Sequence, residues 1–407
     1  MGRKITIVGA GQAGLQLGIG LLDAGYDVTI VSNRTRESLR DGKVMSSQCM
    51  FDMALSYERK HGLDLWDEVC PSVDGISFAV PDGEGGRMLN WSARLDDKAQ
   101  AVDQRVKMPV WMDVFEARGG NLVFHEASID DLEQYTKDAE LVIVAAGKGD
   151  IAKMFERDDE RSAYDAPQRA LALTYVTGMT PRADHSAVCF NMIPGVGEYF
   201  VFPALTTTGP CEIMVFEGIP GGPMDCWDDV KTPEEHLAKS KWILETFLPW
   251  EAERCQNIEL TDDNGILSGR FAPTIRKPIG ELPSGAPVLG LADVVVLNDP
   301  ITGQGSNNAS KCAETYLNAI VEHGNRPYDR EFMQATFEKY WDIAQWVPAW
   351  PNALLAPPPP FVLNALGAAG QIPQVAHRFV NGFNDPRDYF EWFMDPVKSE
   401  EYIGSFA

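Results

Sequence analysis

The sequence predicts an α/β protein with three parts: a parallel sheet alternating with helices, a mostly antiparallel second sheet, and a helical C-terminal region. Three observations predict this arrangement. A short apolar run from Ile5 to Val8 leads into a glycine-rich turn, an apolar helix and a second strand. Short β-branched and aromatic runs, broken by Gly and Pro, extend from Arg169 to Phe216. The stretch after Pro327 has helical spacing and is interrupted by four consecutive prolines.

Length and composition limit the class of protein. At 407 residues the chain exceeds the size at which a single hydrophobic core stops growing, so we expect more than one packed unit. Hydrophobic residues make up 44% and charged residues 23% of the chain, which excludes a disordered or coiled-coil protein. The 35 basic and 59 acidic residues leave a net charge of −24, so we expect no nucleic-acid or membrane partner. No apolar run has the length of a signal peptide or a membrane span, which predicts a cytoplasmic protein.

Cysteine and histidine form no recognisable site. The seven cysteines are odd in number and widely spaced, and the six histidines fall in no triad or metal-ligand spacing. We therefore expect reduced thiols, no disulfide, no metal and no catalytic side chain.

The first strand is followed directly by the pattern Gly9-x-Gly11-x-x-Gly14. The first glycine permits a tight turn, the second lets the backbone approach a pyrophosphate, and the third lets helix and strand pack closely. The start of the following helix supplies unpaired N–H donors, and we place Gln12 and Ala13 in the same site. The strand, turn, helix and second strand together predict a Rossmann-like unit that binds a dinucleotide.

The end of the second strand departs from the usual pattern. It reads Val31-Ser32-Asn33-Arg34, without the carboxylate that normally binds the adenosine ribose. Ser32 or Asn33 would offer weaker, neutral hydrogen bonds to the ribose. Arg34 would stack on adenine or meet a phosphate, or else be a simple surface cation.

The remaining elements return the chain to the parallel sheet twice. We expect a helix at 51–61, one face of a strand at 76–80, sheet strands at 141–144 and 288–293, and a helix from 305 to about 321. The expected boundaries are 1–45, 95–165 and 280–325 for a discontinuous dinucleotide-binding domain, 46–94 and 166–279 for a substrate-binding domain, and 326–407 for the C-terminal helical region.

A second glycine-rich motif decides between NAD and FAD. The run Gly290-Leu291-Ala292-Asp293, followed by Pro300-Ile301-Thr302-Gly303-Gln304-Gly305-Ser306-Asn307-Asn308, resembles the second FAD fingerprint of the flavoprotein monooxygenases related to aromatic hydroxylases. The resemblance implies that the aspartate holds a flavin ribityl hydroxyl and that the proline faces the flavin ring. A helix that starts at this turn would direct its positive end at the flavin N1–C2 carbonyl.

Two shorter matches extend the resemblance. The run Val144-Ala145-Ala146-Gly147 resembles the middle element of the same family, and Arg105 matches an arginine that often lies near the flavin phosphates. Arg105 as a surface salt-bridge partner is the alternative. The cofactor-binding residues expected from the motifs and the resemblance are Gly9, Gly11, Gln12, Ala13, Gly14, Ser32, Asn33, Arg34, Arg105, Ala146, Gly147, Asp293, Pro300, Gly303, Gln304, Gly305 and Asn307.

No second nicotinamide-binding motif follows a strand, and the middle Asp-Gly motif of hydroxylases that bind NADPH directly is not found. The whole chain resembles the oxygenase component of the two-component (group E) flavoprotein monooxygenases, the styrene and indole monooxygenases. The resemblance implies that diffusible, reduced FAD comes from a separate NADH:FAD oxidoreductase. The oligomeric state stays open, with a homodimer among the options.

The segment after the second strand lines the substrate pocket in this family, and here its pattern looks like the indole branch. The indole N–H needs an acceptor, and Gln48 or Ser46 would supply one. Without the resemblance, these two side chains are ordinary polar groups of a loop. The substrate residues implied by the resemblance are Met45, Ser46, Gln48, Met50, Val73, Ile76, Ala99 and Pro300.

The resemblance implies epoxidation of the C2=C3 bond of indole, leading to indigo, through a flavin C4a-hydroperoxide that performs the chemistry itself. The protein would orient the alkene and exclude water. Styrene epoxidation by the same mechanism is the nearest alternative. A single-component NAD(P)H-dependent aromatic hydroxylase is a more distant one, and a non-enzymatic FAD-fold protein such as a guanine-nucleotide dissociation inhibitor is the last.

Overall fold

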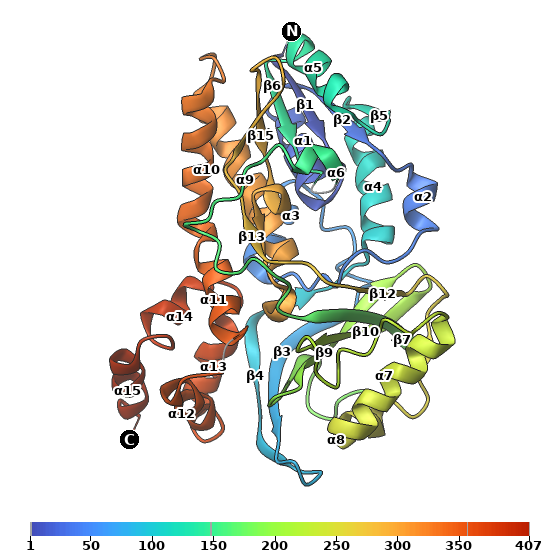
Figure 1. The fold of residues 1–407 in the computed structure, drawn as a ribbon, viewed down its shortest axis with the longest axis vertical. Helices are drawn as coiled ribbons and strands as arrows, with labels where there is room; N and C mark the ends of the chain where they lie inside the picture. Colours follow the sequence, from blue (N-terminus) through green and yellow to red (C-terminus); the bar gives the residue numbers. More distant parts are fainter. Residues whose placement is uncertain (1, 147–148, 356, 407) are drawn as a thin grey trace.

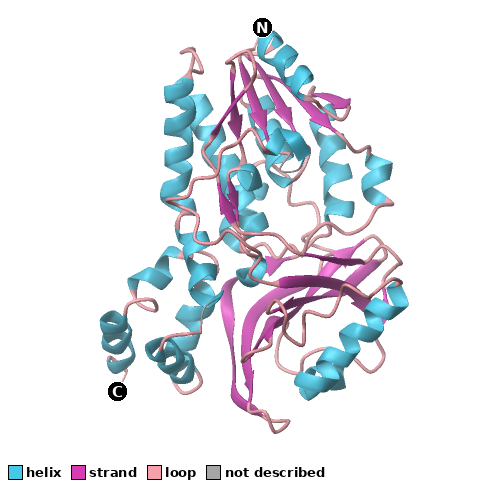
Figure 2. Cartoon of the chain, in the orientation of Figure 1, coloured by secondary structure: helices cyan, strands magenta, loops and turns pink. Residues whose placement is uncertain are grey.

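The molecule is built around two sheets, one above the other in Figure 1, with helices packed around both. The structure is a computed structural model that describes residues 2–146, 149–355 and 357–406. Gly147, which the sequence analysis places in the cofactor site, lies outside the described residues. The N-terminus lies at the outer end of the parallel sheet, and the C-terminus ends the last group of helices (Figures 1 and 2).

The first sheet has six strands, of which all but an edge strand run parallel. In spatial order the strands are β14 (Ile279–Glu281), β15 (Pro287–Gly290), β6 (Leu141–Val144), β1 (Lys4–Val8), β2 (Asp27–Ser32) and β5 (Asn121–Phe124). Val8 of β1 is in register with Val31 of β2 and Val144 of β6. The carboxyl ends of these three strands therefore meet at one edge, where ligands bind in open parallel sheets.

Eight helices accompany this sheet. They are α1 (Gln12–Asp23), α2 (Arg36–Arg40), α3 (Asp52–Lys60), α4 (Gln104–Ala117), α5 (Ile129–Asp138), α6 (Gly149–Ala152), α9 (Gly305–His323) and α10 (Arg330–Ala344). Helix α1 is apolar along most of its length and packs against α9 and α4. It ends at Asp23, and Gly25, just beyond the cap residue Ala24, has a φ of +86° that suits glycine. The Rossmann-like βαβ unit is present as the sequence predicts.

The second sheet is antiparallel except where β3 pairs with β8. Its strands, in spatial order, are β11 (Glu259–Leu260), β7 (Ala170–Thr177), β10 (Gly209–Gly218), β9 (Gly197–Thr206), β8 (Ala187–Ile193), β3 (Ser72–Pro81) and β4 (Arg87–Gln100), with β12 (Ile266–Gly269) also paired to β7. The expected domain boundaries stay a prediction, and β4 continues past the one drawn at residue 94. The mostly antiparallel character predicted for this region is confirmed.

Both faces of the second sheet are buried, because side chains alternate along each strand. On β10, Ile213 and Val215 join one apolar cluster, whereas Met214 and Phe216 join another on the opposite face. The second of these clusters is completed by α7 (Pro233–Phe247) and α8 (Pro249–Arg254). The first is completed by the C-terminal helices, which lie beside β4 in Figure 1.

The C-terminal region is helical, as predicted. Its helices are α11 (Trp346–Leu355), α12 (Pro360–Ala369), α13 (Pro373–Asn381), α14 (Arg387–Glu391) and α15 (Pro396–Gly404). Trp350 and Trp392 are fully buried here, and the indole N–H of Trp91 in β4 donates to the Leu366 carbonyl of α12 at 2.9 Å. Short elements complete the fold: β13 (Thr274–Ile275), β16 (Val296–Leu297) and the 3-10 turns η1 (Ala292–Val294) and η2 (Pro300–Thr302). Within the described ranges, no helix is long and apolar enough to cross a membrane.

Candidate active site

The turn after β1 is shaped by three glycines, each for a different reason. Gly9 has a φ of +122°, and a Cβ there would lie 2.8 Å from the carbonyl carbon of Ala145. A Cβ on Gly14 would overlap the carbonyl oxygen of Gly9, so the third glycine permits close packing of α1 on β1. A Cβ on Gly11 would meet no protein atom within 4 Å. The space next to Gly11 is therefore open to a ligand.

The start of α1 offers a set of unpaired donors next to that space. Its first intrahelical bond runs from the Leu15 N–H to the Gly11 carbonyl, so the N–H groups of Gln12, Ala13 and Gly14 have no intrahelical partner. No side chain caps this end, and its first turn has no acidic residue. The helix start therefore presents a positive potential that suits a phosphate group.

The end of β2 uses its polar groups locally. The Ser32 hydroxyl donates to the Arg34 carbonyl at 2.8 Å and accepts from the Arg34 N–H at 3.2 Å. Asn33 and Arg34 are exposed, and the Arg34 guanidinium lies 2.8 Å from the Met45 sulfur. The roles predicted for these three residues toward a nucleotide stay predictions. Of the three, the Ser32 hydroxyl has its hydrogen already engaged.

Arg105 lies in the first turn of α4, but it belongs to a buried ion-pair network. Its Nε donates to Asp103 at 2.9 Å, and its two terminal nitrogens bind Asp262 at 2.9 and 3.0 Å. Thr206 and the Gly42 carbonyl take the remaining two N–H groups. All five guanidinium donors are engaged, and the side chain is 2% exposed. A phosphate would reach Arg105 only in exchange for one of these partners.

A second buried ion pair lies beneath the first glycine turn. The Lys107 ammonium contacts the Glu58 carboxylate, and Gln12 Nε2 donates to the same carboxylate at 3.0 Å. The pair links α3 and α4 to the start of α1. Sequence reasoning did not identify it, because nothing in the spacing of Glu58 and Lys107 indicates that they meet.

The second glycine-rich motif begins after β15 with a strained residue. Ala292 has a φ of +53°, which makes it the one non-glycine with positive φ in the described part of the chain. Asp293 follows and is exposed, yet protein atoms crowd its carboxylate, and this desolvation raises its pKa to about 6. Among the described residues, no group donates a hydrogen bond to this carboxylate. The Asp293 carboxylate is therefore an acceptor without a described hydrogen-bond donor, although the charge of Arg276 partly offsets the rise in its pKa.

The turn from Pro300 to Gly305 resembles the first glycine turn in its openness. Asp299 caps η2 by accepting from the Ile301 N–H at 3.1 Å, and Gly303 adopts a φ of +63°. A Cβ on Gly303 or on Gly305 would meet no protein atom within 4 Å. Helix α9 starts here without a side-chain cap or an acidic residue in its first turn.

Helices α1 and α9 bring the two motifs together. Gln16 of α1 donates from Nε2 to the Ser310 carbonyl of α9 at 3.1 Å. Two uncapped helix starts and two open glycine turns therefore lie on the same pair of packed helices. The buried Thr302 hydroxyl and the whole Asn308 amide have no hydrogen-bond partner among the described residues. These unpartnered polar atoms near the second turn are costly unless a ligand or water satisfies them.

Two side chains of the second motif connect it to other segments. Asn307 Nδ2 donates to the Cys49 carbonyl, and its Oδ1 accepts from the Phe51 N–H, both at 2.8 Å. Gln304 Nε2 donates to the Phe383 carbonyl at 2.9 Å. The second motif therefore holds both the segment after β2 and the C-terminal helical region.

An apolar cavity lies directly against this turn, between η2 and the second sheet. Its walls are aromatic and aliphatic apart from two hydroxyls and a thiol, and it has free space for about one or two water molecules. The lining residues are Ser47, Cys49, Phe51, Ile76, Val188, Phe190, Phe200, Phe202, Val215, Pro300, Ile301, Thr302, Gly303 and Phe383. A small aromatic molecule would enter only if a wall moved.

The cavity includes Ile76 and Pro300 from the predicted substrate residues, but Ser47 and Cys49 line it in place of their neighbours. Residues 46 and 48 face Tyr175 behind the wall: the Ser46 hydroxyl donates to Gln48 Oε1 at 2.9 Å, and Gln48 Nε2 donates to the Tyr175 hydroxyl at 3.3 Å. This local alternation is the signal that sequence reasoning missed. The opposite face of this segment, with Ser47 and Cys49, is the one that lines the cavity.

The other predicted substrate residues lie elsewhere. Val73 and Ala99 pair across β3 and β4 and are fully buried. Met50 is buried with its sulfur 3.3 Å from the Lys107 ammonium, and Met45 lies beside Arg34. None of these four is part of the described lining of the cavity.

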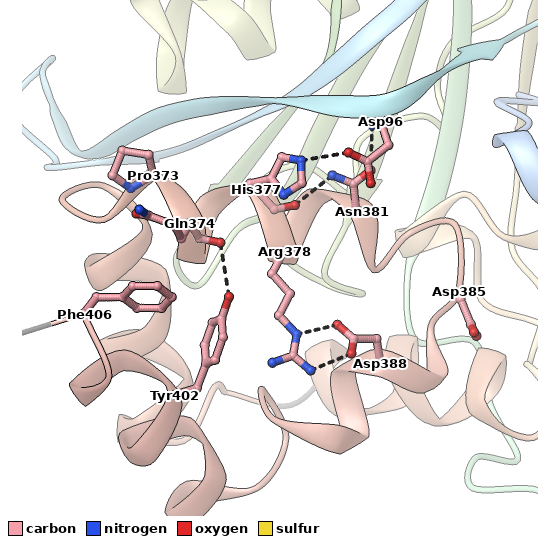
Figure 3. A pocket seen from close by; sticks show the side chains of 10 residues that line it. All are labelled: Asp96, Pro373, Gln374, His377, Arg378, Asn381, Asp385, Asp388, Tyr402 and Phe406. Carbon is pink, nitrogen blue, oxygen red and sulfur yellow. Dashed lines mark hydrogen bonds and ion pairs between the residues drawn. The ribbon is translucent and has the colours of Figure 1, made fainter.

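A separate, wide surface pocket lies between β4 and helices α13 to α15 (Figure 3). Its charged groups pair with one another: His377 Nε2 lies 2.9 Å from Asp96, and Arg378 binds Asp388 at 2.9 and 2.7 Å. Its described lining contains no residue of either glycine motif. This pocket is therefore not the candidate active site.

The fold and the site together define a class of protein. A parallel sheet with two open glycine turns, next to an apolar cavity under a second sheet, is the arrangement of a dinucleotide-binding enzyme with an apolar substrate. The solved structure of the flavin-dependent brominase Bmp2 has this fold, with a TM-score of 0.70 over 100% of this chain and 99% of that chain, at 12% sequence identity. The predicted fold class is confirmed.

Sequence relatives narrow the class. Residues 147–254 match the family described as "Styrene monooxygenase A putative substrate binding domain". The whole chain is 30% identical to styrene monooxygenase StyA of Pseudomonas fluorescens and, equally, to StyA of a Pseudomonas species, over 100% of this chain and 99% of each relative. The chain belongs to the styrene monooxygenase family, the oxygenase components of two-component flavoprotein monooxygenases. It is an FAD-dependent monooxygenase, and its placement in the indole branch stays a prediction.

The residues present fit FAD. The backbone at Gly11, Gly303 and Gly305 is open where a ligand would pass, and each glycine turn ends in an uncapped helix start. Asp293 supplies an unpartnered acceptor between the two turns in the chain. These are the features that an elongated cofactor with a pyrophosphate, ribityl hydroxyls and a ring requires.

Proposed function

We propose that this enzyme epoxidises the carbon–carbon double bond of a small, apolar aryl alkene such as styrene, using reduced FAD delivered by a separate NADH:FAD oxidoreductase. The observation that carries the proposal is the apolar cavity whose wall includes Pro300 and Gly303 of the second glycine motif. In the overall reaction one oxygen atom of O₂ goes to the alkene and the other leaves as water, while FADH₂ is oxidised to FAD.

In this proposal the N–H groups at the start of α1, beside Gly11, hold the pyrophosphate. Asp293 would accept a hydrogen bond from a ribityl hydroxyl, and the turn from Pro300 to Gly305 would hold the flavin ring. When bound, reduced FAD supplies the electrons that convert O₂ into an electrophilic oxygen donor. The positive end of α9 stabilises negative charge that develops on the ring.

The chain's own part is to orient the alkene and to keep water away. Phe190, Phe200 and Phe202 present ring surface to the cavity, and these aromatic walls favour an aryl group over a polar one. The described lining contains no carboxylate, ammonium or imidazole. The proposed reaction needs none, because the electron-rich double bond itself attacks the oxygen donor.

Indole is the second candidate, and one observation favours it. The Thr302 hydroxyl lies in the cavity wall, is buried and has no partner among the described residues, so it would accept an indole N–H. Gln48 would reach the same N–H only by losing its hydrogen bonds to Ser46 and Tyr175. In this second candidate function, Thr302 rather than Gln48 accepts the indole N–H.

The experiment omits NAD(P)H. Protein with chemically reduced FAD is mixed anaerobically and then exposed to oxygenated buffer that contains styrene, indole or neither, and the epoxide, oxidised indole and hydrogen peroxide are quantified. We expect styrene oxide in near-stoichiometric yield, with peroxide as the main product when no alkene is present. Peroxide as the only product with both substrates would refute the proposal. Efficient turnover with NADPH alone would refute the separate reductase.

A further inference from the structure

A second apolar cavity lies directly beside the first, on the side of the C-terminal helices. The two cavities share four side chains: Ile76, Phe190, Ile301 and Phe383. Like the first, the second has free space for only about one water molecule. The four shared side chains are therefore a partition between two small spaces that would form one larger space if the partition opened.

The second cavity is apolar in effect. Trp350, Phe379 and Leu366 of α11 to α13 form its wall opposite the sheet. Glu198 is the one charged side chain in the described lining of this cavity. Its charge is balanced by Arg169, because both carboxylate oxygens accept from the Arg169 guanidinium, at 2.6 and 2.9 Å. A ligand in this space would meet hydrocarbon and aromatic surface, which excludes a charged or strongly polar group.

Phe383 is the part of the partition that is least fixed by regular structure. Ile76 and Phe190 belong to the paired strands β3 and β8, and Ile301 is held in the turn that Asp299 caps. Phe383 lies in the turn between α13 and α14. Its ring centroid is 5.7 Å from that of Phe51 in the first cavity.

On the other side, the Phe383 ring packs against the second cavity, with its centroid 6.2 Å from that of Trp350. Two hydrogen bonds also fix the backbone of the turn. The Phe383 carbonyl accepts from Gln304, and the Asn384 carbonyl accepts from the Lys311 ammonium at 3.0 Å. Phe383 is thus positioned by the second glycine motif, and its buried ring fills the space between the two cavities.

We propose that the second cavity is a subsite for an apolar alkyl or aryl substituent on the ring of the substrate, and that Phe383 is the specificity-determining residue that closes it. This inference rests on the proposed function, since it assumes that the first cavity holds the aryl alkene. In the wild-type protein Phe383 limits binding to compact aryl alkenes. Shortening Phe383 joins the two spaces and admits a para-substituted ring.

The test measures binding without turnover. Ethylbenzene and para-butyl-ethylbenzene, saturated analogues that cannot be epoxidised, are titrated by calorimetry into wild type, Phe383→Ala and Phe216→Ala. Phe216 is fully buried on the opposite face of the second sheet and lines neither cavity, so Phe216→Ala is the matched control. Each methylene that becomes buried is worth about fourfold in affinity. We expect the affinity ratio of the butyl compound to ethylbenzene to rise about tenfold or more in Phe383→Ala and to stay near the wild-type value in Phe216→Ala.

Circular dichroism and melting temperature establish that each variant is folded, and Phe383→Leu, a smaller truncation, replaces the alanine variant if that one does not fold. Styrene epoxidation by wild type with reduced FAD is measured in parallel. If wild type epoxidises styrene but neither Phe383 variant changes the ratio, the subsite is refuted and the proposed function stands. If wild type neither binds ethylbenzene nor epoxidises styrene, both are refuted.

Discussion

Gly11→Ala separates binding of the cofactor from stability of the fold. The backbone at Gly11 has φ −87° and ψ −169°, which any residue adopts. A Cβ there meets no protein atom within 4 Å. Alanine is therefore expected to leave the free energy of unfolding of the FAD-free protein within about 0.5 kcal/mol of wild type. The added methyl group instead occupies space that a pyrophosphate needs to reach the N–H groups of Gln12 and Ala13.

The expected loss follows from those N–H groups. Displacing a phosphate from one of them removes a hydrogen bond to a charged group, worth about 1.5 to 3 kcal/mol. The dissociation constant of FAD should therefore rise about 10- to 100-fold. Quenching of flavin fluorescence on titration measures the affinity, and thermal unfolding without FAD measures the stability.

Gly14→Ala is the matched control, because its Cβ would overlap the Gly9 carbonyl oxygen. We expect this variant to lose several kcal/mol of stability, at the upper end of ordinary single substitutions. Unchanged FAD affinity in Gly11→Ala would mean that the pyrophosphate does not lie at this turn. Wild-type stability in Gly14→Ala would refute the packing argument for the third glycine.

Two further predictions concern charged side chains. Asp293→Asn should weaken FAD binding about tenfold above pH 6. In wild type the affinity for FAD should fall as the pH drops through the raised pKa of about 6, because the ionised carboxylate is the better acceptor. This pH dependence should vanish in the variant. FAD titrations on both sides of that pH test it, and equal affinities at all pH values would exclude Asp293 from the site. Arg105→Met should cost about 3 to 5 kcal/mol in urea unfolding, because it leaves Asp103 and Asp262 without their buried cation. Weakened FAD binding with wild-type stability would instead support the phosphate role first inferred for Arg105.

Local patterns predicted the elements that carry the motifs. The expected helix at 51–61 corresponds to α3 (Asp52–Lys60), with Phe51 and His61 as its end residues. The expected helix from 305 to about 321 corresponds to α9, which ends at His323. These elements have strong periodicity and clear glycine boundaries, so short-range information was sufficient.

The missed features depend on contacts between distant segments. Arg105 binds Asp262, which is far away in the sequence and belongs to no motif. The ion-pair network could therefore not be predicted from the spacing of residues. The choice between Ser47 and Gln48 as a lining residue depends on which side of an extended segment faces the cavity. A shift of one residue reverses that choice, and only the packing of Tyr175 behind the segment decides it.

The distribution of free polar groups bears on how strongly the cofactor is held. Two cations of α4, Arg105 and Lys107, are already paired with buried carboxylates. Among the described residues, the groups left for FAD are backbone N–H donors, open glycine backbone, the carboxylate of Asp293 and the exposed Arg34 at the end of β2. The start of α1 would bind a phosphate through dipoles rather than through a salt bridge to Arg105 or Lys107, so the affinity for FAD should be moderate. A moderate affinity suits the proposed function, because FAD has to arrive reduced from another protein and leave oxidised in every catalytic cycle.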